Sequence, residues 1–280
     1  MKPIDIYNKH VSESIEKIIS EKESEGGKIL LQLNKTIVIG LCIISLLFIG
    51  SCGRNDSSKL DSEIDKNMHR SLSIYPTKNL EEFYDIDGVR NRDFKKGDKG
   101  KWILDSSINT KKDNELKSEG AVLYIDRNKR TARGYYYINK FKDNGKKNEK
   151  HYPIEMKENN LIPSGKNVNV NTREKIKKFN FFVQYTDVNS SIENKKGKNA
   201  YNYNLPKFVS EYKMSDKDAL IKSLKSKYKI PYEKATMQII GRSKPKSSSL
   251  GNKEIKVNFK KNKYYFQDSI DFQPTKQSEK

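Results

Sequence analysis

Short connections between strand-like segments most constrain how this chain can fold. The segments AVLYIDRN and TARGYYYINKF are joined through residues 126–130, and KWILDSSI precedes them. HYPIEMKENNLIP has the pattern of a hairpin that turns at Asn159 and Asn160. Antiparallel strands can be joined by a tight turn, whereas parallel strands need a crossover of about a dozen residues. The sequence therefore predicts an antiparallel meander in the middle of the chain.

Helical patterns flank these strands. Every fourth residue from Leu60 to Leu72 is apolar, which places one hydrophobic stripe along a helix. Further helices are predicted at 78–85 and 172–185. Residues 186–207 have the composition of a long polar loop.

The C-terminal part of the chain contains a helix followed by strands. Ser215 is the expected N-cap of the helix DKDALIKSLKSKY, and Pro231 follows its end. ATMQIIGRS and EIKVNFKKNKYYFQDSIDF predict the final strands, the last two turning near Lys261 and Asn262. Together these elements predict an α+β fold, an antiparallel β-meander with helices packed on one face. Stronger curvature of the same sheet would make it a half-barrel.

An uncharged apolar run, IVIGLCIISLLFIG, precedes this region. As a helix it would cover about 21 Å, which is short of the roughly 30 Å hydrocarbon core of a membrane. The sequence Ile49-Gly50-Ser51-Cys52 resembles the bacterial lipobox, in which small residues precede a lipid-bearing cysteine. We therefore expect a secretion signal that is cleaved between Ser51 and Cys52.

Lipid attachment at Cys52 would follow from this motif. The motif implies transfer of a diacylglyceryl group to the Cys52 thiol and, after cleavage, acylation of the new N-terminus. Two or three acyl chains make a stable anchor, whereas one chain is marginal. The expected location is the extracellular face of the cell membrane. The alternative is that Cys52 is a buried thiol of the apolar run, which is how we interpret Cys42.

The predicted organisation separates a leader from one folded domain. Residues 1–36 are too long and too acidic for the start of a signal. If translation begins at a downstream leucine codon, residues 1–36 are not part of the natural protein. The alternative is that they form a genuine cytosolic extension. The remaining parts are the signal and lipobox at 37–51, a lipidated tether at 52–59, a single α+β domain at 60–274 and a polar tail at 275–280.

The formal net charge of +20 lies entirely on the part expected to be exported. Residues 1–51 contain six lysines and six acidic residues, whose charges cancel. A basic chain with many tyrosines is typical of nucleic-acid binding, but export argues against that partner. Wall teichoic polymers, anionic lipid head groups and host surface molecules remain as polyanions. The alternative is a lysine-rich, solvated surface without a partner.

Two turns concentrate basic residues, in the sequences KKGDKGK and DRNKRTAR. Arginine can hold a phosphate or a carboxylate bidentately, so the two turns form a candidate polyanion-binding site. The alternative is that these charges keep an edge strand from aggregating. The candidate residues are Lys95, Lys96, Lys99, Lys101, Arg127, Lys129, Arg130 and Arg133.

No sequence pattern indicates an enzyme. The three histidines, His10, His69 and His151, are not spaced as zinc ligands. Neither a GxSxG motif nor a phosphate-binding loop occurs. The pair Glu81-Glu82 is interpreted as solvated charge. We expect no catalytic residue, no metal and no cofactor other than the covalent lipid on Cys52.

Ordered motifs along the chain resemble one protein family. MHRSLSIYPTKNLEEFYDIDGVRNRDFKKGDKGKWIL, GAVLYIDRNKRTARGYYYINKF, FNFFVQY and KMSDKDALIKSLKSKYKIP, behind the lipobox, are similar to the staphylococcal tandem lipoproteins of the conserved staphylococcal antigen type. The resemblance covers residues 37–274. It implies a membrane-anchored surface lipoprotein without known enzymatic activity, and a role in host-cell invasion and immune stimulation.

Two functions fit these features. The first is a non-catalytic lipoprotein whose basic ectodomain binds a host surface protein or an anionic wall or lipid polymer. The second is a carrier of lipid or glycolipid, because a curved sheet packed on helices can enclose an acyl chain. A continuous apolar cavity between sheet and helices would favour the carrier. A filled core and a basic face would favour adhesion.

Overall fold

The computed structural model describes residues 57–165, 168–202, 204, 207–232, 234–242, 250–259 and 263–275. The chain divides into two compact units, Met1–Cys52 and Gly53–Lys280, and every described residue belongs to the second. The predicted preamble, signal and cleavage site, including Ser51 and Cys52, therefore lie outside the described residues. So do His10 and the predicted turn at Lys261 and Asn262.

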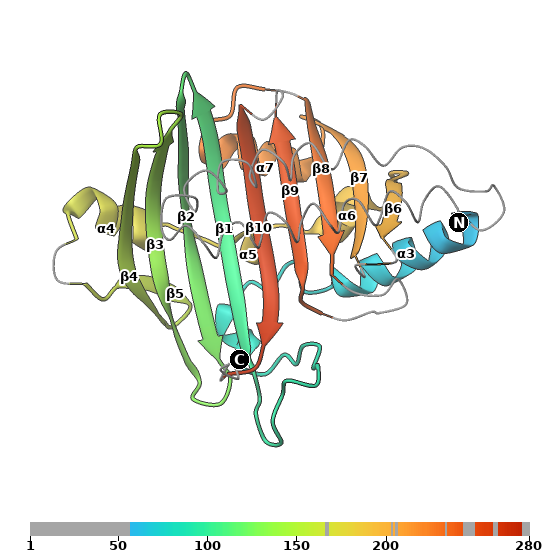
Figure 1. Ribbon diagram of the computed structural model, residues 1–280, viewed down its shortest axis with the longest axis horizontal. Helices are drawn as coiled ribbons and strands as arrows, with labels where there is room; N and C mark the ends of the chain where they lie inside the picture. The colour runs from blue at the N-terminus through green and yellow to red at the C-terminus, as the bar shows by residue number, and fades with distance from the viewer. Residues whose placement is uncertain are drawn as a thin grey trace, which may run out of the picture. The chain divides into compact units, whose positions relative to one another are not determined.

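Ten antiparallel strands form one sheet (Figure 1). Their order across the sheet is β5-β4-β3-β2-β1-β10-β9-β8-β7-β6. The strands are β1 (Lys101–Lys112), β2 (Glu115–Asp126), β3 (Thr131–Lys142), β4 (Lys147–Lys157), β5 (Asn160–Pro163), β6 (Lys198–Asn202), β7 (Lys207–Ser215), β8 (Lys234–Gly241), β9 (Lys253–Phe259) and β10 (Tyr264–Gln273).

The strand order shows two meanders that meet in the middle of the sheet. The chain runs outward from β1 to β5, reaches the opposite edge at β6, and returns inward to β10. β1 and β10 then pair in the centre, with Trp102 opposite Phe272 and Thr110 opposite Tyr264. The predicted α+β fold with an antiparallel sheet is thus confirmed, and the pairing of the first strand with the last completes it.

Helices cover one face of this sheet. In Figure 1 the helices between β5 and β8 lie behind the strands. The helices are α3 (Ser57–Ser71), the 3-10 helix η1 (Leu80–Tyr84), α4 (Val170–Lys177), α5 (Phe182–Tyr185), α6 (Val188–Ile192) and α7 (Ala219–Tyr228). None of the helices in the described part of the chain is both long and apolar enough to cross a membrane.

The core lies between the sheet and these helices. Trp102 and Leu104 alternate along β1 with less buried neighbours, which follows from the two-residue period of a strand. The predicted stripe on α3 is confirmed, because Ile64, Met68 and Leu72 are buried. Burying the apolar surface of these side chains away from water stabilises the fold.

Asp268 on β10 is a carboxyl group buried within this core. Its Oδ2 accepts a hydrogen bond from the Tyr75 hydroxyl at 2.6 Å, and its Oδ1 accepts one from Ser106. Ser106 in turn accepts from the backbone N–H of Phe182 at 3.1 Å. Burial outweighs these hydrogen bonds and raises the pKa of Asp268 to about 7. The cluster joins β1, β10, α5 and the segment after α3.

The region 172–185 differs from its prediction as one continuous helix. α4 ends at Lys177 and α5 begins at Phe182. Between them, Phe181 is fully buried, and the Phe179 ring packs edge-on against it at 5.3 Å between centroids. The four residues between the helices allow both aromatic rings to pack, and burying large aromatic side chains stabilises the fold.

The prediction of one long polar loop at 186–207 was wrong, because this segment contains α6 and β6. Asp187 caps α6 by accepting a hydrogen bond from the backbone N–H of Ser190 at 3.0 Å. In β6, Asn199 accepts from the Ser210 hydroxyl on β7 at 2.6 Å. Polar residues here serve as caps and cross-strand partners, so composition alone concealed the elements.

Three predicted boundaries are also shifted. Ser215 belongs to the end of β7, and Asp218 is the N-cap of α7. The Asp218 carboxylate accepts from the backbone N–H of Ser215 at 2.7 Å, so the two residues form the turn before the helix. The β4–β5 hairpin turns at Glu158 and Asn159, whose φ angles are 47° and 64°. Helix α3 begins at Ser57, inside the predicted tether.

Candidate functional site

The two basic turns of the sequence meet at one end of the sheet. β1 begins where β2 ends, with Lys101 opposite Asp126. The backbone N–H of Arg127 donates to the carbonyl of Gly100 at 3.1 Å, and the N–H of Lys99 donates to Asn128 Oδ1 at 2.9 Å. Segments 85–101 and 126–133 therefore form one surface, which we call the loop end.

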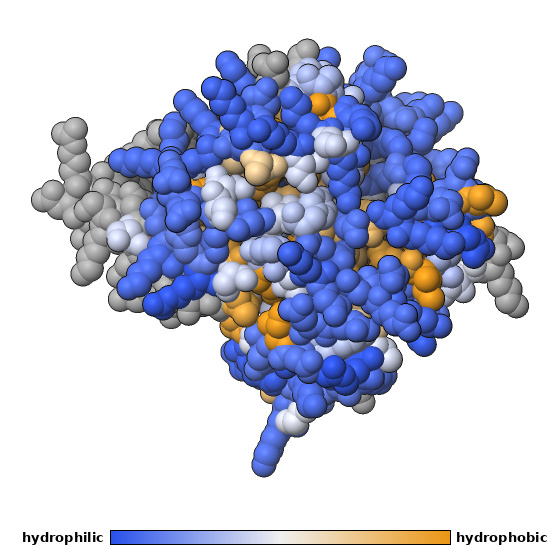
Figure 2. Space-filling model, turned by 180° about the vertical axis from the view of Figure 1, so that it is seen from behind, coloured by the Kyte–Doolittle hydropathy of each residue, from blue (hydrophilic) through white to orange (hydrophobic). Residues whose placement is uncertain are grey.

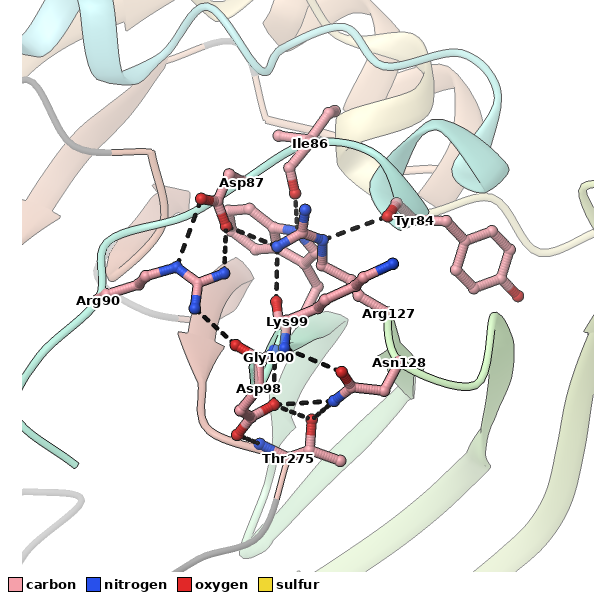
Figure 3. Close-up of polar contacts among 11 residues, drawn as sticks. Tyr84, Ile86, Asp87, Arg90, Asp98, Lys99, Gly100, Arg127, Asn128 and Thr275 are labelled. Carbon is pink, nitrogen blue, oxygen red and sulfur yellow. Dashed lines mark hydrogen bonds and ion pairs between the residues drawn. The ribbon is translucent and has the colours of Figure 1, made fainter. Parts of the chain in front are cut away.

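Arg127 is the centre of the loop end, but it points into the protein (Figure 3). Its Nε donates to the carbonyl oxygen of Tyr84 at 3.2 Å. Its Nη1 donates to Asp87 Oδ1 and to the carbonyl oxygen of Lys99, both at 2.6 Å. The Arg127 side chain is 9% exposed. Its guanidinium is thus occupied internally, which differs from the exposed ligand-binding role that the sequence suggested.

Asp98 is the second centre of the loop end. Its Oδ1 accepts from the backbone N–H of Gly100 and from the Asn128 amide, both at 2.8 Å. Both the hydroxyl and the backbone N–H of Thr275 donate to the same carboxylate, at 2.7 and 2.9 Å. Partial burial acts to raise the pKa of Asp98, but these hydrogen bonds prevail and lower it to about 2. Asp98 thereby ties the segment after β10 to the loop.

Two further arginines form ion pairs at this surface. Arg90 donates to Asp87 through Nη2 at 3.2 Å. Arg130 holds Asp85 with two hydrogen bonds, of 2.6 and 3.3 Å, and its guanidinium lies 5.0 Å from the centre of the Tyr84 ring. The Asp85–Arg130 pair is exposed, so it contributes little to stability.

The remaining predicted cations have no ion pair among the residues that the structure describes. All of them are exposed except Lys101, which is half-buried. The hydrogen-bonded network beneath holds their backbones in place, so that their charges face solvent from a rigid base. These residues are Lys95, Lys96, Lys99, Lys101, Lys129 and Arg133.

Sequence reasoning missed the acidic and amide residues that organise the loop end. Asp87, Asp98 and Asn128 each bind a residue on another segment. A local signal was present, since Asp98 also accepts from the N–H two residues ahead, and Asp126 does the same for Asn128. Such Asx turns mark aspartates that shape the backbone rather than face solvent.

The two described histidines contact an amide and an aromatic ring. His69 Nδ1 lies 3.0 Å from Asn189 Oδ1, and His151 stacks on the Tyr135 ring at 4.8 Å between centroids. Within the described ranges, no group of three or more His, Cys, Asp or Glu residues could hold a metal ion.

These observations define an α+β domain with a basic loop end, in a chain that carries a lipobox-like leader. The chain belongs to the Csa1 family, whose model matches residues 60–275. The predicted resemblance to the staphylococcal lipoproteins of this type is thereby confirmed.

Similar proteins are named lipoproteins. One from Staphylococcus aureus strain MRSA252, called an uncharacterized lipoprotein, is 40% identical over 253 residues, which cover 86% of this chain and 98% of the relative. Another, from Staphylococcus epidermidis, is 38% identical and covers 87% of this chain and 97% of the relative. Among solved structures, the Mycobacterium tuberculosis lipoprotein LppX covers 78% of this chain and 100% of its own, with 9% identity and a TM-score of 0.36.

Proposed function

We propose that this protein is a non-catalytic, lipid-anchored surface lipoprotein whose loop end binds acidic molecules of the host surface or anionic polymers of the cell envelope. The observation that carries the proposal is the group of exposed, unpaired cations held on the Arg127 and Asp98 network. Because their backbones are already fixed, these cations lose less conformational freedom on binding an anion than cations on a flexible loop would. Through this binding, the protein would serve host-cell invasion and immune stimulation.

The interior supports adhesion over the carrier function. Phe181, Phe182 and Phe266 are fully buried and fill the space between β10 and the helices. A hollow of about 470 Å³ in the described part of the chain is lined largely by polar residues of α6 and α7, including Asp187 and Asp218. Figure 2 shows the helix-covered face, where hydrophilic residues surround small hydrophobic patches. These features match a filled core with a polar exterior.

Neutralising four loop-end lysines should weaken attachment to host cells. The variant replaces Lys95, Lys96, Lys99 and Lys129 with glutamine and leaves the arginines in place. We expect about tenfold weaker attachment of the detergent-purified protein to cultured epithelial cells, and a strong decline of wild-type attachment between about 50 and 150 mM salt.

A matched variant separates this site from general charge. It replaces the exposed residues Lys157, Lys178, Lys213 and Lys222 with glutamine, which removes the same number of charges elsewhere. Equal attachment by the loop-end variant and the wild type, with both folded, would contradict the proposal. Equal losses in the two variants would reduce it to an effect of net charge.

Replacing Cys52 with serine should abolish lipid attachment at this position. The variant has no thiol to accept the diacylglyceryl group, so the remaining apolar leader would be the sole membrane attachment. We expect intact-mass spectrometry of the wild-type membrane fraction to show an acylated N-terminal Cys52, and the variant to lack this species. A wild-type protein that carries a free thiol at this position would refute the anchor.

A further inference from the structure

Three hairpins meet at the end of the sheet opposite the loop end, at the top of Figure 1. They connect β1 to β2, β3 to β4, and β9 to β10. The backbone N–H of Lys111 donates to the carbonyl of Lys263 at 2.8 Å, and the N–H of Asp143 donates to the carbonyl of Asn114 at 3.0 Å. Segments far apart in the sequence are therefore joined at this end.

Lysines dominate these joined hairpins. Five of them are exposed and have no ion pair in the described part of the chain: Lys111, Lys112, Lys142, Lys146 and Lys263. Among the acidic residues nearby, Glu115 pairs with Lys140 and Glu149 pairs with Lys147, each at 3.3 Å, while Asp113 and Asp143 lie in the turns and leave an excess of positive charge. We call the five exposed lysines the lysine row.

The lysine row is long and narrow because it follows the end of a sheet. The three hairpins include six adjacent strands, from β4 to β9 through the β1–β10 pair. The row lysines lie between β4 and β10, and these five adjacent strands, at about 4.8 Å between neighbours, span about 19 Å. Lysine presents a flexible point charge, without the planar fork by which arginine selects one anion geometry. The row thus suits a ligand that repeats a negative charge along a line.

We propose that the lysine row binds a linear polymer of phosphate groups. A single phosphate can meet only one or two of these ammonium groups, whereas a polymer meets several at once and gains from their effective concentration. Each phosphate that is neutralised also releases counterions, which makes such binding strongly dependent on salt. A flat anionic membrane would contact the row along one line only, so we assign the polymer. This site is independent of the proposed function of the loop end.

The test uses the complete protein, purified from cell membranes in neutral detergent, with sodium polyphosphate as the probe. Replacing all five row lysines with glutamine should weaken binding by at least about tenfold and make the slope of log affinity against log salt shallower by about 3. The matched control replaces Lys157, Lys178, Lys213, Lys217 and Lys222, which are exposed and lie elsewhere. Thermal unfolding of each variant checks that it is folded.

Each outcome bears on the assignment. Selective loss in the row variant, with little change in the control, supports the site. Equal losses in both variants, or no loss in the row variant, would overturn it. Stronger binding to phosphatidylglycerol vesicles than to polyphosphate would overturn the choice of ligand. The loop-end variant should retain the share of polyphosphate affinity that the row variant loses, so failure of either site leaves the other separately testable.

Discussion

Replacing Asp268 with asparagine is expected to stabilise the protein at pH 8 and to change its stability little at pH 4. The pKa of Asp268 is raised to about 7 in the folded protein, mainly by burial, against an ordinary value of 3.8. The folded state therefore holds this proton more tightly than the unfolded chain. The contribution of protonated Asp268 to the free energy of unfolding is fully present below about pH 4 and is lost as the pH rises toward 7. The loss amounts to about 4 kcal/mol, at about 1.4 kcal/mol for each pH unit.

Urea unfolding at pH 4, 6 and 8 measures this effect. Like the protonated carboxyl group, the asparagine amide offers Ser106 and Tyr75 one acceptor oxygen and one donor, but it cannot ionise, so the variant should lose the wild-type decline. Asp105 also has a raised pKa, of about 6, and contributes in the same direction in both proteins. The difference between the two curves thus measures Asp268 together with its Coulombic interaction with Asp105. An Asp113→Asn variant, altered at an exposed carboxyl, is the control. Parallel curves for wild type and Asp268→Asn would refute the prediction.

Replacing Arg127 with glutamine should destabilise the domain by about 3 kcal/mol. The change removes donors from the carbonyls of Tyr84 and Lys99 and separates Asp87 from its closest cation. Lysine should not restore stability, because one ammonium cannot reproduce the fork that reaches three acceptors in different directions. The free energy of unfolding from urea titration measures both effects.

The neighbouring Arg130 provides a matched control for this experiment. It also makes two hydrogen bonds to a carboxylate, that of Asp85, but the pair is exposed. An Arg130→Gln variant removes the same charge from the same hairpin and should be much closer to the wild type in stability. If the two variants were equally stable, the Arg127 network would have no structural role.

The fold class followed from the sequence because its signals are local. Short links between strands require antiparallel pairing, and the apolar stripe on α3 appears within a few helical turns. The pairing of β1 with β10 could not be predicted, since it joins residues such as Trp102 and Phe272 from opposite ends of the domain. The family motifs made the overall class recognisable without fixing this register.

The candidate sites differ in how far a single segment of the sequence determines them. DRNKRTAR identified a basic hairpin, but no feature of that segment distinguishes buried Arg127 from exposed Arg130. The distinction comes from Tyr84 and Asp87, which belong to a distant loop. The lysine row was missed for a similar reason, because its members come from three hairpins that only the sheet topology brings together.

The central β1–β10 pairing has a consequence for secretion. β1 begins at Lys101 and its partner β10 ends at Gln273, so under the proposed export nearly the whole domain would have to cross the membrane before the middle of the sheet could form. Contacts between such distant segments carry a high entropic cost and form slowly. If the protein is exported as proposed, its two half-sheets are expected to join only after the last strand has emerged from the export channel.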